Sequence, residues 1–325
     1  MKNLFKFIAL ALVLALVGIA LTAAWYLRWD ELPPPELPGV VEGGSLEHEE
    51  RERRWISYIP ASAGESPPLL LVLHGSTSDG PGMRAGSFYS FDVLAEREGL
   101  VITYPDGVQN HWNDCRKNAS YAANLLKVDD LGFLAALIDT MVERHGVDPR
   151  QVFVTGMSNG GHMAYRLALE TPELIAGASA LVANLPLETN SECVASGQPV
   201  PVQVINGSED GINPYEGGVV NLFGDVSRGQ VMSSIETARY WAGLGGYDEE
   251  PSARETIDGN PDDKTNLEIL SWTGGHVPVQ LVSVMGGGHT FPHRVYALPK
   301  ILGTTSHEVD GAELIWGFFE EIGAP

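Results

Sequence analysis

The stretch "VFVTGMSNGGHMAYRLA", Val152 to Ala168, is where the chain passes from an apolar run into an alternating apolar and polar pattern. Ser158 lies at this junction, between glycines at positions 156 and 160. The glycine–x–serine–x–glycine pattern is typical of a nucleophilic serine on a strained turn, because small neighbours let strand and helix approach closely. The alternative is a polar residue in a glycine-rich connection. We predict a strand before Ser158, a helix after it, and a nucleophile between them.

The rest of the chain alternates short apolar runs with longer amphipathic segments. The apolar runs end in turns and are typical of strands buried on both faces; they include "PLLLVLHG" (68–75), "LVITYPDG" (100–107), "VPVQVING" (200–207) and "VPVQLVSVMGGG" (277–288). The amphipathic segments have helical spacing and stop at glycine; they include residues 90–99, 129–146 and 311–323. This alternation predicts an α/β fold with a mainly parallel central sheet and helices on both faces.

Polar residues follow several predicted strands, at the carboxyl ends where active sites form in such sheets. His289 follows a late strand and is the candidate general base for Ser158. Asp210, just past the preceding buried strand, is the candidate carboxylate that orients this base, with Glu209 as the alternative. His162, one helical turn after the serine, is a rival base, but that helix position favours packing. The order Ser158, Asp210, His289 is the order of α/β-hydrolase triads and predicts the α/β-hydrolase fold.

A serine hydrolase also needs N–H donors for the oxyanion that forms during the reaction. The N–H of Asn159, at the start of the predicted helix, is one candidate, because a helix N-terminus favours negative charge. The second donor is expected on the loop after "LLLVLHG", from Ser76 or Thr77. The sequence alone does not choose between these two.

The formal net charge of −22 excludes some partners. A strongly acidic surface repels nucleic acid and anionic lipid headgroups, so we expect neither as a partner. The two cysteines, Cys115 and Cys193, do not suffice for a thiolate zinc site. In an exported chain such a pair favours a disulfide over two separate buried thiols. We expect no metal or organic cofactor.

The N-terminus is expected to lie at a membrane. Residues 1–6 carry two lysines and are predicted to stay cytoplasmic. The apolar run 7–27 is long enough to span a bilayer, which favours an anchor over a cleaved signal peptide. Residues 28–50, which include "ELPPPELPG", are predicted to form a proline-rich acidic spacer. Residues 51–325 form the predicted catalytic domain, on the extracytoplasmic side of the membrane or secreted.

Several longer blocks resemble one family, the poly(3-hydroxybutyrate) depolymerase and feruloyl esterase group of α/β-hydrolases. The blocks are "LHGS", "YPDGVQNHWNDCR", "VDDLGFLAALID", "VDPRQVFVTGMSNGGHMAYRLA", "NGSEDGINPYEGG", "GGGHTFP" and "LGTTSHEVDGAELIWGFF". The resemblance implies Ser158 as nucleophile, Asp210 as acid and His289 as base. It also implies a bridge between Cys115 and Cys193.

The chain departs from the family pattern beside the site. Ser76 stands where a cysteine is often found, and Asn206 where the family has histidine. Phe291 replaces the tryptophan after the His-Thr pair, and His293 replaces a glycine. These changes bear on acyl-group preference. Trp112 and Phe291 are candidate apolar walls for the acyl group, with loop packing as the alternative role.

We therefore expect an exported serine esterase that acts through an acyl-enzyme. The expected substrates are soluble carboxylic esters: hydroxybutyrate-type oligoesters, feruloyl or other aryl esters, or short-chain acyl esters. Its only other expected partner is the membrane, through the N-terminal segment. Two alternatives stay open at this point. One is a peptidase of the same fold, whose triad looks identical, and the other is a tethered binding module without catalysis.

Overall fold

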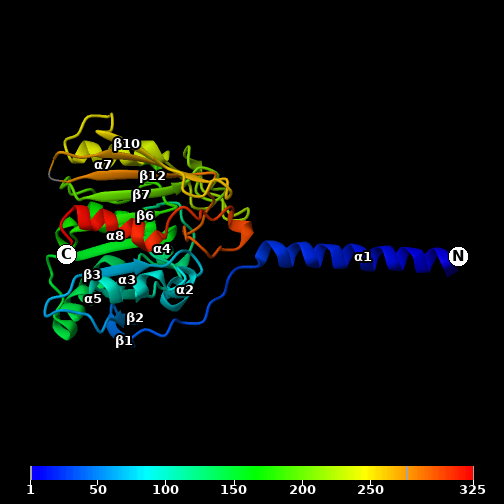
Figure 1. The fold of residues 1–325 in the computed structure, drawn as a ribbon, viewed down its shortest axis with the longest axis horizontal. Helices are drawn as coiled ribbons and strands as arrows, with labels where there is room; N and C mark the ends of the chain where they lie inside the picture. Colours follow the sequence, from blue (N-terminus) through cyan, green and yellow to red (C-terminus); the bar gives the residue numbers. More distant parts are fainter. Residues whose placement is uncertain (1, 276, 325) are drawn as a thin grey trace.

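The structure is a computed structural model that describes residues 2–275 and 277–324. Met1, in the predicted cytoplasmic N-terminus, and Pro325, at the end of the predicted catalytic domain, lie outside the described residues. An N-terminal helix, α1 (Lys2–Leu27), projects from a domain built on one large sheet (Figure 1).

The large sheet has ten strands in the order β1-β2-β4-β3-β5-β6-β7-β12-β11-β10. The strands from β4 to β12 in this order run parallel, and the two strands at either edge pair antiparallel. The bounds are β1 (Val40–His48), β2 (Arg51–Ile59), β3 (Leu69–Leu73), β4 (Val101–Pro105), β5 (Val152–Met157), β6 (Gly177–Leu181), β7 (Val202–Gly207), β10 (Ala253–Ile257), β11 (Asn266–Trp272) and β12 (Val279–Met285). A small separate sheet pairs β8 (Gly218–Val219) with β9 (Gln230–Val231).

Helices cover both faces of the large sheet. One face carries α5 (Asp130–His145), α6 (Asn159–Glu170) and α7 (Ser234–Leu244), and the other carries α3 (Ser90–Glu98) and α8 (Gly311–Glu321). The shorter elements are α2 (Gly80–Gly86), α4 (Ala122–Leu125), η1 (Pro172–Leu174), η2 (Glu188–Asn190) and η3 (Lys300–Leu302). The α/β class and the mainly parallel sheet predicted from the sequence are thereby confirmed.

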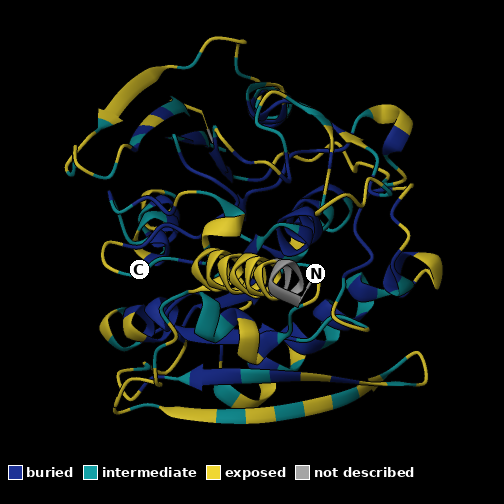
Figure 2. Ribbon diagram, turned by 90° about the vertical axis from the view of Figure 1, so that its right-hand side faces the viewer, coloured by how far each residue is buried: buried dark blue, intermediate teal, exposed yellow. Residues whose placement is uncertain are grey.

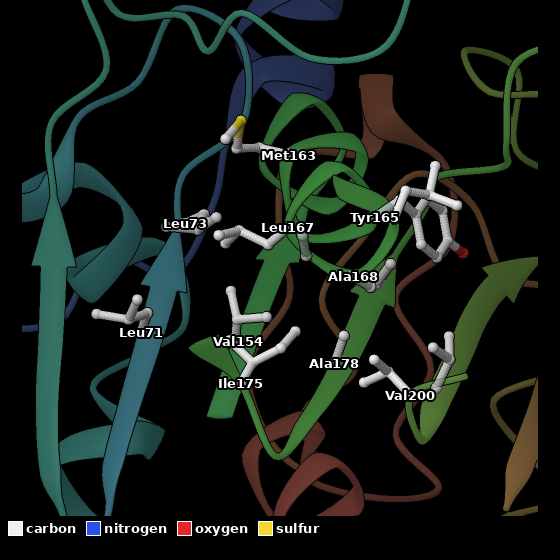
Figure 3. Close-up of a cluster of buried hydrophobic side chains, with 14 of the residues drawn as sticks. Leu71, Leu73, Val154, Met163, Tyr165, Leu167, Ala168, Ile175, Ala178 and Val200 are labelled. Carbon is white, nitrogen blue, oxygen red and sulfur yellow. The ribbon is translucent and has the colours of Figure 1, made fainter. Parts of the chain in front are cut away.

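Side chains of the central strands alternate between the two helical layers. On β3, Leu71 and its neighbours two residues away pack with α5 and α6, whereas Leu70 and Val72 pack with α3 and α8. Figure 3 shows the first of these layers, where Leu71, Leu73 and Val154 of the sheet face Leu167 of α6. Strands buried on both faces explain why the sequence reads as continuous apolar runs.

The predicted spacer is wrong for residues 40–48, which form the edge strand β1. β1 pairs with β2 along its whole length, from Val40 opposite Ile59 to His48 opposite Arg51. Glycine is suited to this strand because the Trp55 side chain of β2 covers Gly44, where a Cβ atom would overlap the indole ring. An edge strand with a solvated face is short of apolar residues, so its composition resembles that of a linker.

The residues between α1 and β1 also contact the domain. Trp29 and Leu32 are half-buried and pack against the core under α3 and α8. The N–H of Asp30 donates to the carbonyl of Ala297, and the N–H of Ala297 donates to the Asp30 carboxylate at 2.9 Å. This part of the predicted spacer therefore lies against the domain surface.

The side chains of α1 that the structure describes are exposed from Phe7 to Leu27 (Figure 2). By length and composition, Leu10–Leu27 is apolar enough to cross a membrane, although an N-terminal signal sequence has the same properties. The division of the first 27 residues into a cytoplasmic end and an anchor stays a prediction.

Candidate active site

Ser158 occupies the tight turn between β5 and α6. Its backbone has φ 55° and ψ −115°, a conformation that side chains other than glycine rarely adopt. The flanking glycines are required by close approach: a Cβ at Gly156 would overlap the backbone of Gly160, and one at Gly160 would overlap the carbonyl of Leu73 on β3. The Ser158 N–H donates to Leu181 O on β6 at 2.8 Å, which fixes the turn. The predicted strand, turn and helix are all present.

His289 and Asp210 come together at the carboxyl ends of β12 and β7. His289 Nδ1 lies 2.7 Å from Asp210 Oδ2, and both side chains are buried. The second carboxylate oxygen, Oδ1, accepts the N–H groups of Ile212 and Asn213 at 2.8 and 2.9 Å. These bonds fix the Asp210 carboxylate. Because Nδ1 of His289 is engaged with it, Nε2 is the ring nitrogen available to accept a proton.

The alternative residues lie in other surroundings. Glu209 is exposed, and only its backbone N–H is engaged, to Gly287 O at 2.9 Å. His162 is buried inside α6, and burial, with the nearby Arg116 charge, lowers the pKa of its imidazole well below the usual value. Among the described side chains, Nδ1 of His162 has no hydrogen-bond partner. The geometry of a base held by a carboxylate is thus found at His289 and not at His162.

A cavity of about 270 Å³ lies over Ser158 and His289. Its apolar lining includes Met83, Ile212, Leu222, Phe223, Leu298 and Leu302. Trp112 and Phe291, predicted as walls for the acyl group, are absent from this lining and have exposed fractions of 0% and 1%. The prediction for both is corrected, because each aromatic ring is used in packing: Trp112 beside the His74 ring and Phe291 against Phe91.

The loop after β3 lines the same cavity with Ser76 and Thr77. The N–H of Thr77 donates to Asn110 O at 2.9 Å, so it is engaged in holding the loop. The N–H of Ser76 has no acceptor among the described residues. This difference favours Ser76 as the second oxyanion donor beside Asn159, a choice that the sequence left open.

His74 holds the loop that carries Ser76. Its Nδ1 donates to Gly75 O at 2.7 Å, and its Nε2 accepts the N–H of Gly107 at 2.9 Å. Burial lowers the pKa of His74 to about 4, so the ring is neutral at pH 7, as this pair of bonds requires. In a trans peptide the C=O and N–H groups point in opposite directions, so the Ser76 N–H points away from His74.

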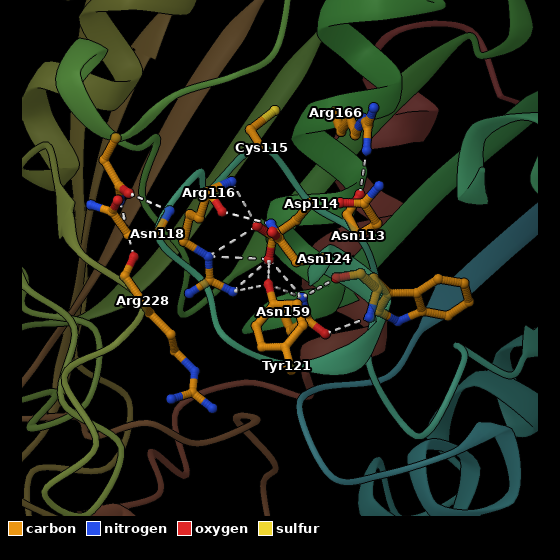
Figure 4. A network of polar contacts seen from close by, with 12 residues as sticks. Asn113, Asp114, Cys115, Arg116, Asn118, Tyr121, Asn124, Asn159, Arg166 and Arg228 are labelled. Carbon is orange, nitrogen blue, oxygen red and sulfur yellow. Dashed lines mark hydrogen bonds and ion pairs between the residues drawn. The ribbon is translucent and has the colours of Figure 1, made fainter. Parts of the chain in front are cut away.

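A buried polar network, which we call the clamp, holds the other candidate donor residue, Asn159 (Figure 4). Its side chain joins two sites on Trp112: Oδ1 accepts the Trp112 N–H at 2.8 Å, and Nδ2 donates to the Trp112 carbonyl at 3.1 Å. Nδ2 also donates to Asp114 Oδ2 at 2.6 Å and lies 3.2 Å from the Tyr121 hydroxyl. Arg116 completes the clamp. Hydrogen bonds therefore hold both the oxygen and the nitrogen of the Asn159 side-chain amide.

The charged pair in the clamp is fully enclosed. Arg116 Nη2 lies 2.5 Å from Asp114 Oδ2, and the Tyr121 hydroxyl donates to the same oxygen at 2.6 Å. Burial alone would raise the pKa of Asp114, but the Arg116 guanidinium holds that pKa well below its usual value. Sequence reasoning does not find the clamp, because "NDCR" lies within a longer polar stretch, "DGVQNHWNDCRKNAS", and nothing in it marks these residues as buried.

Cys115 and Cys193 form a disulfide, as predicted. Their Cα atoms are 5.0 Å apart, across a sequence separation of 78 residues. Cys115 stands between Asp114 and Arg116 in the sequence. Beside the bridge, the N–H of Glu192 donates to Cys115 O at 3.0 Å. It therefore ties the clamp to the segment after η2. Within the described residues, no group of three or more His, Cys, Asp or Glu side chains is arranged to hold a metal.

Comparison with known proteins relates part of the chain to one family. Residues 54–195 match the family model described as "Esterase PHB depolymerase". The match includes Ser158 and ends before Asp210 and His289. The family resemblance inferred from the sequence blocks is thereby confirmed.

The similarity to individual proteins extends beyond residues 54–195. The chain is 29% identical over 259 residues to "Putative esterase NocK" of Nocardia uniformis subsp. tsuyamanensis, covering 77% of this chain and 73% of that protein. It is 27% identical over 255 residues to "Acetylxylan esterase A" of Aspergillus awamori, covering 72% and 79%. The solved structure of the acetyl xylan esterase from Aspergillus awamori superposes with a TM-score of 0.55 at 21% identity, over 78% of this chain and 95% of that chain.

These similarities agree with the fold. The chain has the α/β-hydrolase fold, as predicted from the order of the candidate triad. Its relatives are carboxylic ester hydrolases. The family match and the serine hydrolase fold place the chain in the same class of enzyme.

Proposed function

We propose that the protein hydrolyses carboxylic esters through an acyl-enzyme on Ser158, with His289 as general base and Asp210 orienting it. The observation that carries this proposal is the 2.7 Å contact between His289 Nδ1 and Asp210 Oδ2, on the wall of the cavity that also contains the strained Ser158. A carboxylate on Nδ1 fixes the tautomer in which Nε2 accepts a proton. The N–H groups of Asn159 and Ser76 are the proposed oxyanion donors.

The proposed reaction has two halves. Ser158 Oγ attacks the ester carbonyl carbon while its proton passes to Nε2 of His289. The bond to the leaving oxygen then breaks as that oxygen takes the proton from His289, and an alcohol departs. Water attacks the resulting acyl-serine with the same base, which releases a carboxylic acid and restores the Ser158 hydroxyl. Every step uses groups of this chain, substrate and water.

The proposed substrates are small or oligomeric esters: short-chain acyl esters, feruloyl or aryl esters, and hydroxybutyrate-type oligoesters. The names of the relatives support acetyl esters of xylan as a further member of this group. A cavity of about 270 Å³ with a mainly apolar lining suits a compact acyl group. The disulfide and the apolar helix α1 support an extracytoplasmic location, because disulfides persist in oxidising compartments.

A fluorophosphonate probe tests the nucleophile directly. We expect the full-length protein to be labelled at Ser158, and Ser158→Ala to lose both labelling and ester hydrolysis, with a fall in rate on the order of 10⁴-fold or more. The matched control Ser120→Ala removes an exposed hydroxyl and should retain both. Labelling of wild type and Ser158→Ala to the same extent would refute the proposal. A folded wild-type protein without any labelling or turnover would favour the non-catalytic binding module.

A substrate panel separates the esterase from the peptidase. The measurement is kcat/KM on p-nitrophenyl butyrate, methyl ferulate, a soluble hydroxybutyrate oligomer, an acetylated xylo-oligosaccharide and a peptide amide. We expect rapid cleavage of the first ester, cleavage of at least one other ester, and amide turnover near background. Efficient amide cleavage with negligible ester turnover would instead establish the peptidase.

A further inference from the structure

Helix α1 joins the domain on the face that carries the candidate active site. The ammonium group of Lys300 lies 3.8 Å from the centre of the Trp25 ring, near the end of α1. A few residues later, Asp30 exchanges hydrogen bonds with Ala297. The base of α1 is thus attached to the segment from Ala297 to Lys300. Figure 1 shows α1 leaving the domain on the side where the parallel strands end, and Figure 2 looks along α1 onto this face.

The segment that holds α1 also contacts the catalytic histidine. The N–H of His289 donates to Leu302 O at 2.7 Å. Leu298 and Leu302 line the cavity over Ser158. One stretch of fewer than ten residues, 297–302, therefore contacts the base of the helix at one end and the active site at the other.

A second cavity of about 380 Å³ lies between the base of α1 and the cavity over Ser158. It shares Ile212, Phe223 and Leu302 with the cavity over Ser158. Its other lining residues include Lys300, which contacts Trp25, and Ile301. The two cavities together form a groove that runs from the base of α1 to the nucleophile.

Large apolar side chains are exposed at the outer edge of this groove, beside the polar side chains of Glu209, Asn221 and Lys300. We call Phe223, Ile301 and Leu302 the rim. Phe223 is 62% exposed and Ile301 is 44% exposed. Large apolar side chains left in water beside a binding site are typical of surfaces that meet a lipid or protein partner. Here the rim lies next to a helix of 26 residues, which spans about 39 Å at 1.5 Å per residue, against about 30 Å for the hydrocarbon core of a bilayer.

We propose that this face rests on the bilayer, with α1 inserted, and that the groove admits amphiphilic esters from the membrane surface. Trp25 and Tyr26 then lie at headgroup level, where aromatic side chains are favoured, and the rim lies beside them. Contact through apolar side chains also suits a chain of net charge −22, which is repelled by anionic headgroups. The inference rests on the proposed esterase function and names a membrane-resident class of its substrates.

The test compares a membrane-resident ester with a water-soluble ester. Full-length protein is reconstituted in phosphatidylcholine vesicles, checked by flotation, and assayed on p-nitrophenyl palmitate in the vesicles and on p-nitrophenyl acetate in solution. We expect Ile301→Asp to lower hydrolysis of the palmitate ester at least fivefold, because a carboxylate on the rim opposes contact with lipid. Hydrolysis of the acetate ester should stay within twofold, because Ile301 does not line the cavity over Ser158, and this rate also shows that the variant is folded.

The control is Val194→Asp, which places the same charge on a side chain that is 78% exposed and belongs to neither cavity. It should change neither rate by more than twofold. An Ile301→Asp variant with equal effects on both esters, or a protein that does not float with the vesicles, would overturn the proposal. Failure of the esterase function itself gives a different result, namely no hydrolysis of either ester by the wild type.

Discussion

The two sides of Ser158 are built in opposite ways. On one side, the clamp encloses an ion pair and a side-chain amide whose polar atoms bond to one another, and a disulfide closes the loop that carries it. On the other side, the rim leaves Phe223 and Ile301 in solvent. The comparison indicates that the two regions have different roles: the clamp fixes Asn159 beside Ser158, and the rim faces solvent at the edge of the groove. Changes in the clamp should therefore affect stability and turnover. Changes in the rim should affect binding of a soluble ester only at Phe223 or Leu302, which also line the cavity over Ser158.

The largest expected effect comes from breaking the clamp with Asp114→Ala. This change leaves the buried Arg116 guanidinium without its carboxylate, and loss of one partner of a buried pair typically costs about 3–5 kcal/mol. We expect a fall of that size in the free energy of unfolding, measured by urea denaturation. We also expect a lower kcat at unchanged KM, because Asn159 loses a hydrogen bond that positions its backbone.

The matched control for this prediction is Asp148→Ala. It removes a carboxylate that pairs with the exposed Arg150 at 2.8 Å. The Asp148 side chain is 12% exposed but its partner Arg150 is 87% exposed, so no buried charge is left unpaired, and the unfolding midpoint should move less than in Asp114→Ala. Equal losses in the two variants would contradict the idea that enclosure makes the clamp rigid.

An intermediate effect is expected from acid, through His74 on the clamp side. Burial lowers the pKa of His74 from 6.5 to about 4. Between these values the unfolded chain binds a proton that the folded chain does not, so the free energy of unfolding falls as the pH falls from about 6.5 toward 4. By pH 5 this amounts to about 2 kcal/mol relative to neutral pH. Above about pH 7.5 both states are neutral at this ring and the effect is absent.

Urea denaturation at pH 7.5, 6 and 5 measures this dependence. His74→Asn should be less stable than wild type at pH 7.5, because the bonds to Gly75 and Gly107 are disturbed. Between pH 7.5 and pH 5, its free energy of unfolding should also fall less than that of the wild type. His162, His111 and His293 will keep part of the decline, because burial lowers the pKa of each of these rings as well. An unchanged decline in His74→Asn would show that this ring does not carry the effect.

The sequence predicted the fold and the residues around Ser158 because their signals are local. Steric demand at Gly156 and Gly160 depends on neighbours within a few positions, so the turn can be recognised from a short motif. Strands buried on both faces appear as uninterrupted apolar runs. Asp210 and His289 were identified as candidates from their places after such runs, and the structure brings these two side chains into contact.

The features that sequence reasoning missed depend on contacts between distant segments. The clamp joins Asn159 to residues 45 and 47 positions away, and a polar run does not show which partner it will meet. Trp112 is hydrophobic enough for either a cavity wall or a core position, and only the tertiary structure decides between them. The sequence predicts a spacer at β1 because an edge strand buries one side at most, so its apolar pattern is weak.

The smallest expected effect is that of Phe223→Ala on a soluble ester. The ring lines the cavity over Ser158 yet is 62% exposed, so its removal leaves no buried void, and stability should change by no more than about 0.5 kcal/mol. It contacts neither Asp210 nor His289 through a hydrogen bond, so its contribution is apolar contact with the acyl group in ground state and transition state alike. Loss of such uniform binding raises KM without lowering kcat. We expect a KM for p-nitrophenyl butyrate that is higher by about two- to fivefold, with kcat within twofold of wild type. A tenfold fall in kcat at constant KM would instead show that the loop at residues 221–224 positions the reacting groups, and the contrast between a rigid clamp and a substrate-facing rim would then fail.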